Sequence, residues 1–246
     1  MRIAVITDVH GNLEALRAVL ADLNRSEPDE VIFGGDVALF GSHGRECWQH
    51  VLDMNWRTVQ GNTDRYLADP ESKLQALRST SPLAAEQLER NLAWGRAQIG
   101  DALIARMASM PTIVRIGSPA GKLVVVHGAP GNDEVGLNPD TTDSHLSQTI
   151  GAVDSAALVC GHTHRAFVRH VARMLIVNCG SVGRSYDGHP GQATYALLDD
   201  DAGRWAATIR QISYDYQKAH RQLKASGAPI SPSIGNGLLT ALAPAE

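Results

Sequence analysis

The sequence is short of cysteine, of long hydrophobic runs and of excess positive charge, and each shortage excludes a class of protein. Its three cysteines, Cys47, Cys160 and Cys179, form no Cys-x-x-Cys pair and give an odd count, so we expect no disulfide framework. No apolar run approaches the roughly 18 residues that a membrane span requires. A net charge of −4 gives no general attraction to nucleic acid or to anionic membranes.

The N-terminal residues 1–6 run directly into an apolar stretch and carry no signal-peptide pattern. Together with the missing membrane span, this predicts a cytoplasmic protein with no membrane partner. A chain of 246 residues that is 43% hydrophobic can bury a substantial core. We therefore expect one domain over residues 1–246 with one insertion.

Short apolar runs alternate with helical patterns in the first quarter of the sequence. Residues 3–6, 30–33 and 56–59 read as strands, and residues 13–23 and 46–54 have helical spacing. Short links between such elements predict a right-handed parallel sheet.

Residues from about 66 to 111 change to a helical pattern that indicates an insertion between strands. Ser81-Pro82 is typical of a helix start, and the apolar stripe is interrupted near Gly95 and Gly100. Because this insertion leaves the sheet next to Asn62, it is a candidate cover for any pocket there.

Strand patterns return after residue 111. A hairpin is predicted over residues 112–127, and the buried run 156–159 leads into Gly-His-Thr-His. The hairpin spacing of the strands after residue 166 predicts a second, largely antiparallel region. Residues 215–225 have a helical pattern, and the tail from Gly227 gives no clear signal.

Metal-ligand residue types recur where the predicted strands end, and ligands of open α/β sheets collect at the carboxyl ends of strands. These residues are Asp8, His10, Asp36, Asn62, His127, His162 and His164. In extended chain, residues two apart point to one side, which would pair Asp8 with His10 and His162 with His164. A surface His-x-His turn or an aspartate helix cap explains any one of them, but not their recurrence after successive strands.

Seven such groups exceed what one tetrahedral zinc ion can use. Their number suits two five- or six-coordinate divalent ions that share a carboxylate. Nitrogen and oxygen donors without thiolate favour manganese, iron, zinc, cobalt or nickel over calcium.

The motifs Asp-x-His, Gly-Gly-Asp, Gly-Asn-x-Asp, His-Gly and Gly-His-Thr-His, in this order, resemble those of the calcineurin-like metallophosphoesterase superfamily. Asn-x-Gly-Ser-Val-Gly at residues 178–183 resembles its small bacterial and archaeal phosphodiesterase branch. The resemblance implies an α/β (α+β) fold, a four-layer αββα sandwich of two mixed sheets. It also implies a binuclear metal centre in a hydrolase that cleaves phosphodiester bonds.

The resemblance places Asp8, His10 and His164 on one ion. Asn62, His127 and His162 would bind the other, with Asp36 bridging the two. Asp36, Asn62 and His127 would then serve catalysis by holding a metal-bridging hydroxide that attacks phosphorus. Two divalent ions, two carboxylates and one hydroxide leave about one positive charge, which suits an anionic phosphate.

One position departs from the family pattern, because many members have a leaving-group-protonating histidine where this chain has Thr63. General acid catalysis is typically worth about 10²–10⁴-fold, mostly for poor leaving groups. Alkyl monoesters should therefore be poor substrates unless His145, His189 or Asp64 substitutes. The hydrolysis of aryl diesters and phosphoanhydrides should be slowed least by the missing histidine. A dinucleoside polyphosphate hydrolase is therefore the alternative activity.

Other residues support weaker expectations. We expect Asn12 to cap a helix rather than bind phosphate, and Arg184 to be a surface arginine rather than a phosphate ligand. Asn178 is a candidate brace for a metal-binding loop, and Asp64 either does the same or starts a turn.

The expected partner is a small phosphorylated substrate, with nucleotides among the candidates, and self-association stays open. A non-catalytic interaction scaffold of the same fold, as in the retromer subunit, is the rival from another class. The complete ligand set argues against that scaffold. Nucleic acid is an unlikely partner, because a DNA nuclease would need a basic groove.

Overall fold

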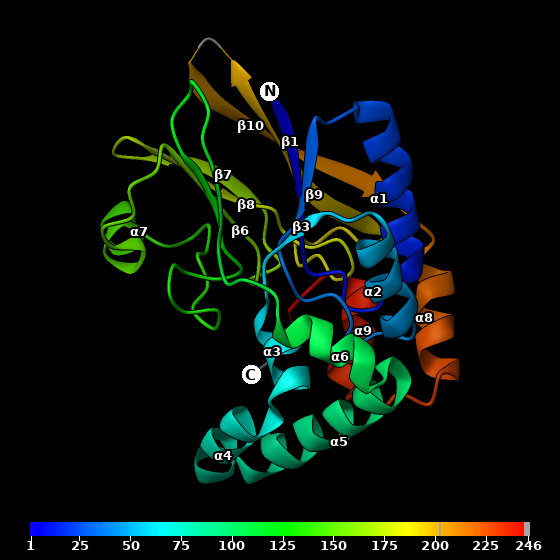
Figure 1. Cartoon of the computed structure of the whole chain (residues 1–246). Coiled ribbons are helices and arrows are strands. Elements are labelled where there is room, and N and C mark those ends of the chain that lie inside the picture. The colour runs from blue at the N-terminus through cyan, green and yellow to red at the C-terminus, as the bar shows by residue number, and fades with distance from the viewer. Residues whose placement is uncertain (202, 244–246) are drawn as a thin grey trace.

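Two five-stranded mixed sheets pack against each other in the computed structural model, which describes residues 1–201 and 203–243 (Figure 1). The first sheet has the order β10-β9-β1-β2-β3. Its strands are β1 (Arg2–Ile6), β2 (Glu30–Phe33), β3 (Arg57–Thr58), β9 (Gln192–Asp201) and β10 (Arg204–Ser213). The pairs β1–β2 and β2–β3 are parallel, which confirms the parallel unit predicted for the first quarter of the chain.

The second sheet has the order β4-β5-β6-β8-β7. Its strands are β4 (Val114–Ile116), β5 (Leu123–Val125), β6 (Ala157–Cys160), β7 (Phe167–Val171) and β8 (Met174–Asn178). The β4–β5 hairpin is antiparallel as predicted, whereas β5, β6 and β8 run parallel. The expectation of a separate, largely antiparallel region is wrong, because the β9–β10 hairpin pairs with β1 in the first sheet.

The strand β1 shows how the four layers form. Its side chains alternate, so that Ile3 and Val5 join the core between the sheets while Ala4 and Ile6 face the helices. The helices α1 (Leu13–Ser26) and α2 (Gly44–Asp53) contribute to the core on that helical side. The second sheet is covered by α7 (Asp143–Ile150), which completes the αββα sandwich.

The predicted insertion is helical throughout. It begins within α3 (Asn62–Ala68) and continues through α4 (Pro70–Thr80), α5 (Pro82–Ile99) and α6 (Asp101–Ala108), with proline in the first turn of α4 and α5. Gly95 does not interrupt α5, because it packs inside the helix against Leu39 and Leu67. The break comes at Gly100, whose φ of 85° ends α5 and starts α6.

The C-terminal part forms α8 (Tyr216–Ala225), as predicted, and α9 (Pro232–Thr240), which the sequence did not reveal. The backbone N–H of Gly188 donates to the carbonyl of Ala241, which fixes the end of α9 near the loop after β8. Among the described residues, no helix combines the length and apolar character that crossing a membrane requires.

Candidate metal centre

All seven predicted ligands lie in loops or helix starts at the carboxyl ends of β1, β2, β3, β5 and β6, and the fold brings them into contact. Five of them have left-handed backbone conformations, with φ between 46° and 68°: Asp8, His10, Asp36, His162 and His164. Such conformations are uncommon outside glycine and concentrate at functional sites. The expectation that extended strand directs Asp8 with His10, and His162 with His164, to one side is therefore wrong, because β1 ends at Ile6 and β6 at Cys160. Tight turns, rather than continued extended strand, aim these side chains inward.

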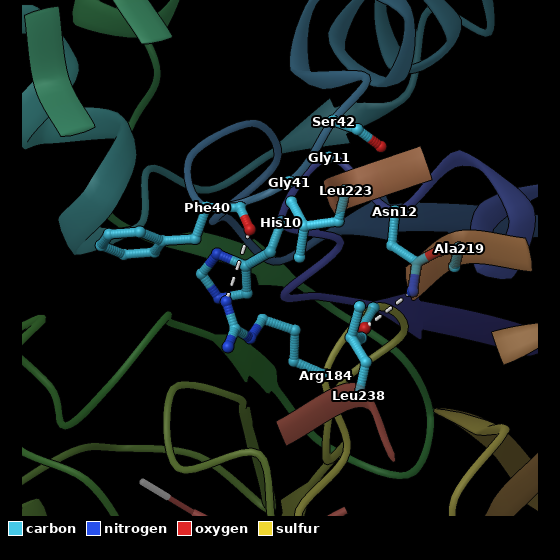
Figure 2. A pocket seen from close by; sticks show the side chains of 11 residues that line it. His10, Gly11, Asn12, Phe40, Gly41, Ser42, Arg184, Ala219, Leu223 and Leu238 are labelled. Carbon is cyan, nitrogen blue, oxygen red and sulfur yellow. Dashed lines mark hydrogen bonds between the residues drawn. The ribbon is translucent and has the colours of Figure 1, made fainter. Parts of the chain in front are cut away.

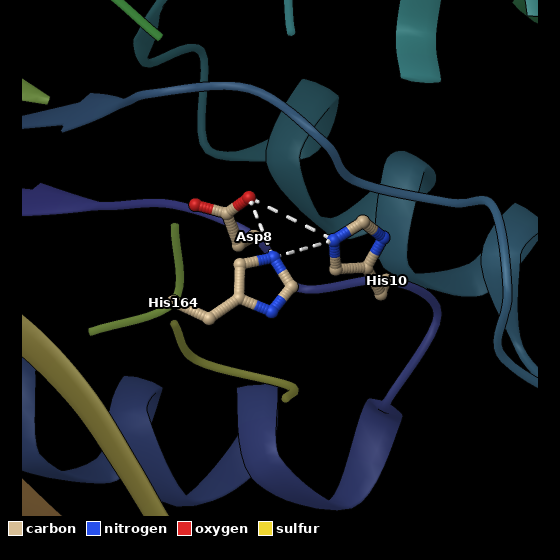
Figure 3. Close-up of side chains that lie close together, drawn as sticks. All are labelled: Asp8, His10 and His164. Carbon is tan, nitrogen blue, oxygen red and sulfur yellow. Dashed lines mark hydrogen bonds and ion pairs between the residues drawn. The ribbon is translucent and has the colours of Figure 1, made fainter. Parts of the chain in front are cut away.

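Asp8, His10 and His164 form one candidate metal-binding group (Figure 3). His164 Nε2 lies 3.2 Å from Asp8 Oδ1, and His10 Nε2 lies 3.1 Å from His164 Nε2. His10 Nε2 is 3.7 Å from Asp8 Oδ1. All three residues are buried.

A second cluster surrounds Asn62. Its Oδ1 is 3.0 Å from His127 Nε2 and 3.0 Å from His162 Nδ1. Asp36 lies between the two clusters, with Oδ2 3.6 Å from His10 Nε2 and 3.5 Å from His127 Nε2. Asp8 also approaches both, since its Oδ1 is 3.9 Å from His127 Nε2, and Asp8, Asp36 and His127 form a second group able to hold an ion.

Each of the four imidazoles is oriented by a hydrogen bond from its outer nitrogen to a backbone carbonyl. The acceptors are Leu39 for His10, Gly34 for His127, Glu134 for His162 and Arg184 for His164, at 2.8–3.2 Å. A carbonyl oxygen only accepts, so these outer nitrogens must carry hydrogen. In the neutral ring the inner nitrogen then presents its lone pair to the cluster, as metal-binding histidines do.

With only protein charges present, the site attracts a proton. Burial lowers the pKa of His127, but Asp36 and Asp8 outweigh it and raise that pKa to about 10. Burial acts to raise the pKa of Asp36, yet His127 and His10 bring it to about 2. Burial, with the charge of His127, lowers the pKa of His162. Burial also acts to raise the pKa of Asp8, but His164 and His127 outweigh it and lower that pKa. The centre therefore holds two ionised carboxylates that favour a positive charge between them.

The donor set fits divalent metal ions. Inner nitrogens 3.1 Å apart in His10 and His164 would repel each other as two lone pairs, and a shared cation removes that repulsion. Imidazole, carboxylate and amide oxygen donors, with no thiolate among them, suit first-row transition metals.

Asp64 stabilises the backbone near this centre through hydrogen bonds. Its buried carboxylate accepts hydrogen bonds from the backbone N–H groups of Asp36 at 2.8 Å, Val37 at 3.1 Å and Gly61 at 3.0 Å. Burial and the charge of Asp36 raise the pKa of Asp64 to about 6. The carboxylate therefore braces the Asp36 loop, one of the two predicted roles.

Asn178 braces the loop that carries His162 and His164, as predicted. Its Nδ2 donates to the carbonyl of Gly161 at 2.8 Å and to Thr163 Oγ1 at 3.0 Å. Asn12 caps α1, since its Oδ1 accepts from the backbone N–H of Ala15 at 3.2 Å, which confirms the predicted cap.

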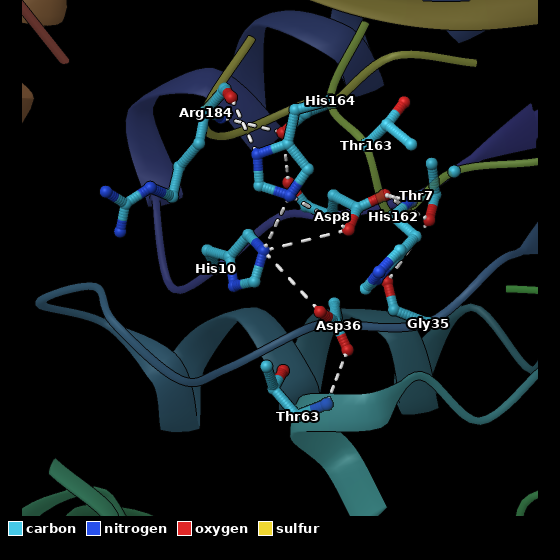
Figure 4. A network of polar contacts seen from close by, with 12 residues as sticks. Thr7, Asp8, His10, Gly35, Asp36, Thr63, His162, Thr163, His164 and Arg184 are labelled. Atoms are coloured by element: carbon cyan, nitrogen blue, oxygen red, sulfur yellow. Dashed lines mark hydrogen bonds and ion pairs between the residues drawn. The ribbon is translucent and has the colours of Figure 1, made fainter. Parts of the chain in front are cut away.

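A pocket of about 230 Å³ opens beside the two clusters. Its walls combine predicted ligands with five further residues, which are Phe40, Thr63, Arg184, Tyr186 and Ile234. Asn62 and Thr63 at the start of α3 line it, but no described residue between 66 and 111 does, so the predicted insertion itself supplies no wall. Figure 4 shows Thr63 beside Asp36, to which its backbone N–H donates at 2.9 Å.

None of the three candidate substitutes for a general acid reaches this pocket. His145 and His189 are exposed outside it, and Asp64 is committed to backbone N–H groups. The hydroxyl of Thr63 is buried and has no hydrogen-bond partner among the described residues.

Arg184 is the residue for which the sequence prediction was wrong. It is 6% exposed rather than a surface arginine. Figure 2 shows it with His10 among the residues that line a small cavity, whose walls also include Ala219 and Leu223 of α8 and Leu238 of α9. The sequence offered no signal for this burial, because the covering helix α9 was itself not predicted.

Comparison with known proteins agrees with this geometry. Residues 1–203 match the calcineurin-like phosphoesterase superfamily domain. An uncharacterized protein of Methanocaldococcus jannaschii is 27% identical over 92% of this chain and 93% of its own length.

Two solved structures are also similar. A metallophosphoesterase from Sphaerobacter thermophilus is 27% identical, with a TM-score of 0.75 over 98% of this chain and 99% of that one. A hypothetical protein from Pyrococcus horikoshii has a TM-score of 0.81 at 17% identity, over 98% of both chains, and shows the shared fold. The protein described here belongs to the calcineurin-like phosphoesterase superfamily, a metal-dependent family.

Proposed function

We propose that the protein is a di-metal-dependent phosphodiesterase. One observation carries this proposal: four imidazoles, each tied to a backbone carbonyl by its outer nitrogen, turn their inner nitrogens toward two buried carboxylates and Asn62 Oδ1. Asp8, His10 and His164 would hold one ion, and Asn62, His127 and His162 the other. Asp36 is suited to bridge them because its Oδ2 lies 3.6 Å and 3.5 Å from an imidazole of each cluster.

Two divalent ions at this centre would supply Lewis-acid stabilisation of phosphate charge and a water of lowered pKa as nucleophile. The protein's own contribution is orientation. The backbone carbonyls fix each imidazole, and Asp64 fixes the loop of Asp36 through three backbone N–H groups. Burial excludes bulk water and strengthens each of these electrostatic contacts.

The leaving group distinguishes the possible substrates. Thr63 has a hydroxyl that is far too weak an acid to protonate an alkoxide, and none of His145, His189 and Asp64 lines the pocket to replace it. Esters whose leaving groups are stable anions therefore fit best, which favours aryl diesters. The same reasoning leaves phosphoanhydrides of dinucleoside polyphosphates as a second candidate substrate.

The test is a screen of purified protein reconstituted separately with manganese, iron, zinc, cobalt and nickel. We expect hydrolysis of bis(p-nitrophenyl) phosphate to exceed that of alkyl monoesters, with a diadenosine polyphosphate assayed in parallel. His145→Ala serves as a control histidine variant outside the site. A preference for alkyl monoesters would contradict the role given to Thr63. Absence of activity with every metal, in protein that binds two ions, would favour the scaffold function.

A further inference from the structure

Arg184 is a buried cation without a counter-ion of its own. Its Nη2 donates to the carbonyl of Ile234 at 2.5 Å and its Nη1 to that of Phe40 at 3.5 Å. Within residues 1–201 and 203–243, no acidic side chain forms an ion pair with it. Carbonyl dipoles orient a guanidinium but do not neutralise it, and burial of an unpaired charge is costly. Such a group is expected where an anion binds.

The guanidinium has unused capacity for that anion. It carries five N–H donors, of which the two bonds above occupy two. Arg184 lines the same pocket as His10, Asp36 and His164. A phosphate group held at the metal centre would therefore lie in the pocket that Arg184 lines, with an oxygen directed toward the guanidinium.

Apolar side chains line the same pocket as the arginine. The Tyr186 ring stacks on the His164 imidazole, with centroids 4.8 Å apart and planes 29° apart. Phe40 lies 6.0 Å from the His10 ring, and Ile234 reaches in from α9. Flat rings and an aliphatic side chain form a recess suited to a flat aromatic group.

We propose that Arg184 binds a phosphate oxygen of the substrate and that Phe40, Tyr186 and Ile234 hold its aromatic ester group. The inference rests on the proposed phosphodiesterase function and adds the side chains that would recognise the phosphate and the aromatic ring of its substrate. It makes α9 a specificity element, and α9 lies outside residues 1–203 that match the family domain.

The experiment measures binding of two non-hydrolysable probes to the manganese-loaded protein by calorimetry. Phenylphosphonate offers anion and ring, whereas methylphosphonate offers the anion alone. Arg184→Ala should weaken both by about tenfold or more, since hydrogen bonds to charged groups contribute that much, and Arg184→Lys should restore part of the affinity. Ile234→Ala should weaken phenylphosphonate about three- to tenfold and leave methylphosphonate nearly unchanged.

Matched controls come from the adjacent helices. Arg221→Ala on α8 changes an exposed arginine and Leu239→Ala on α9 an exposed aliphatic residue, and neither should alter the affinity for either probe. The metal content of each variant is measured, so that a lost ion is not mistaken for a lost contact.

Two results would overturn the inference: equal affinity of wild type and Arg184→Ala for both probes, or equal loss of both probes in Ile234→Ala. The binding measurement does not depend on turnover. Probe binding that depends on Arg184 without hydrolysis of any ester would instead refute the proposed function. Diester hydrolysis with no effect of Arg184→Ala on either probe would refute only the further inference.

Discussion

Thr63 occupies the first turn of α3, where its backbone N–H donates to Asp36 Oδ1 at 2.9 Å and its hydroxyl has no partner among the described residues. We predict that Thr63→His raises the rate of phenyl phosphate hydrolysis by about 10- to 100-fold, because an imidazolium can protonate the leaving oxygen. The rate with bis(p-nitrophenyl) phosphate should change little, since p-nitrophenolate leaves without a proton. Steady-state kinetics with both substrates measure the effect.

Thr63→Val is the matched control, because it keeps the shape of the side chain and removes only the hydroxyl. It should leave the ratio of the two rates unchanged. An equal gain on both substrates in Thr63→His would mean that the substitution acts by some route other than leaving-group protonation.

His162 and His164 are two residues apart but approach different partners, Asn62 Oδ1 and Asp8 Oδ1 respectively. We predict that His162→Ala and His164→Ala each lower kcat/KM for bis(p-nitrophenyl) phosphate by about 100-fold or more, through weaker binding of different ions. Metal titration followed by calorimetry should show one weakened site in each variant. Two fully occupied sites together with wild-type activity in either variant would contradict the assignment.

The identity of the candidate ligands could be predicted from the sequence, but the backbone that presents them could not. Polar residues after apolar runs located Asp8, Asp36 and His127 correctly at strand ends. The φ values of 68° and 58° at His162 and His164 arise from tertiary contacts, such as the hydrogen bond from the His162 N–H to Asp8 Oδ2 at 3.0 Å. Such contacts join residues more than 150 positions apart and leave no local pattern.

The secondary-structure elements were predicted more accurately than the pairing of the strands. The β9–β10 hairpin was expected from its spacing, but spacing does not say which sheet a hairpin joins. That choice depends on β9 pairing antiparallel with β1, where Ala4 lies opposite Leu197. Periodicity reports which face of a strand is buried and nothing about the neighbour at its edge.

Asp22 links α1 to this hairpin. Its buried carboxylate accepts from Tyr195 Oη at 2.7 Å, from Arg210 Nη2 at 3.0 Å and from Arg25 Nη2 at 3.0 Å. Burial acts to raise the pKa of Asp22, but the hydrogen bonds from Arg210, Tyr195 and Arg25 outweigh it and lower that pKa. We predict that Asp22→Asn lowers the free energy of unfolding by about 1–3 kcal/mol near pH 7, a range discounted because Arg210 is partly exposed.

The pH dependence of this effect follows from the direction of the pKa shift. A carboxylate with a depressed folded-state pKa stabilises the protein above its unfolded pKa of about 3.9, and that stability is lost as the pH falls through the folded value. The difference between wild type and Asp22→Asn should therefore be constant from pH 7 to about 5 and shrink below pH 4. Urea unfolding measures it, with exposed Asp53→Asn as the control. A difference that grows on acidification would contradict the assigned network.

At the scale of the whole molecule, the candidate centre joins the two sheets. Asp8, Asp36 and Asn62 follow strands of the first sheet, whereas His127, His162 and His164 follow strands of the second. The core between the sheets, which includes Ile3 and Val159, brings these edges together. The single domain over residues 1–246 stays a prediction, and it is consistent with a centre that neither sheet can form alone.

Ions bound at this junction should therefore stabilise the entire fold. Ligands that bind only the native state add about 2.7 kcal/mol at a hundred times their dissociation constant, and each kcal/mol raises Tm by about 2–4 °C in a protein of this size. We predict that saturating manganese raises Tm by about 5–10 °C over chelator-treated protein. His164→Ala should keep part of that increase, because it removes a donor from one cluster only. Asp36→Asn should lose most of it, because the Asp36 carboxylate approaches an imidazole of each cluster. Differential scanning calorimetry of the three proteins, with and without metal, tests this order, and a larger loss in His164→Ala would mean that Asp36 does not bridge.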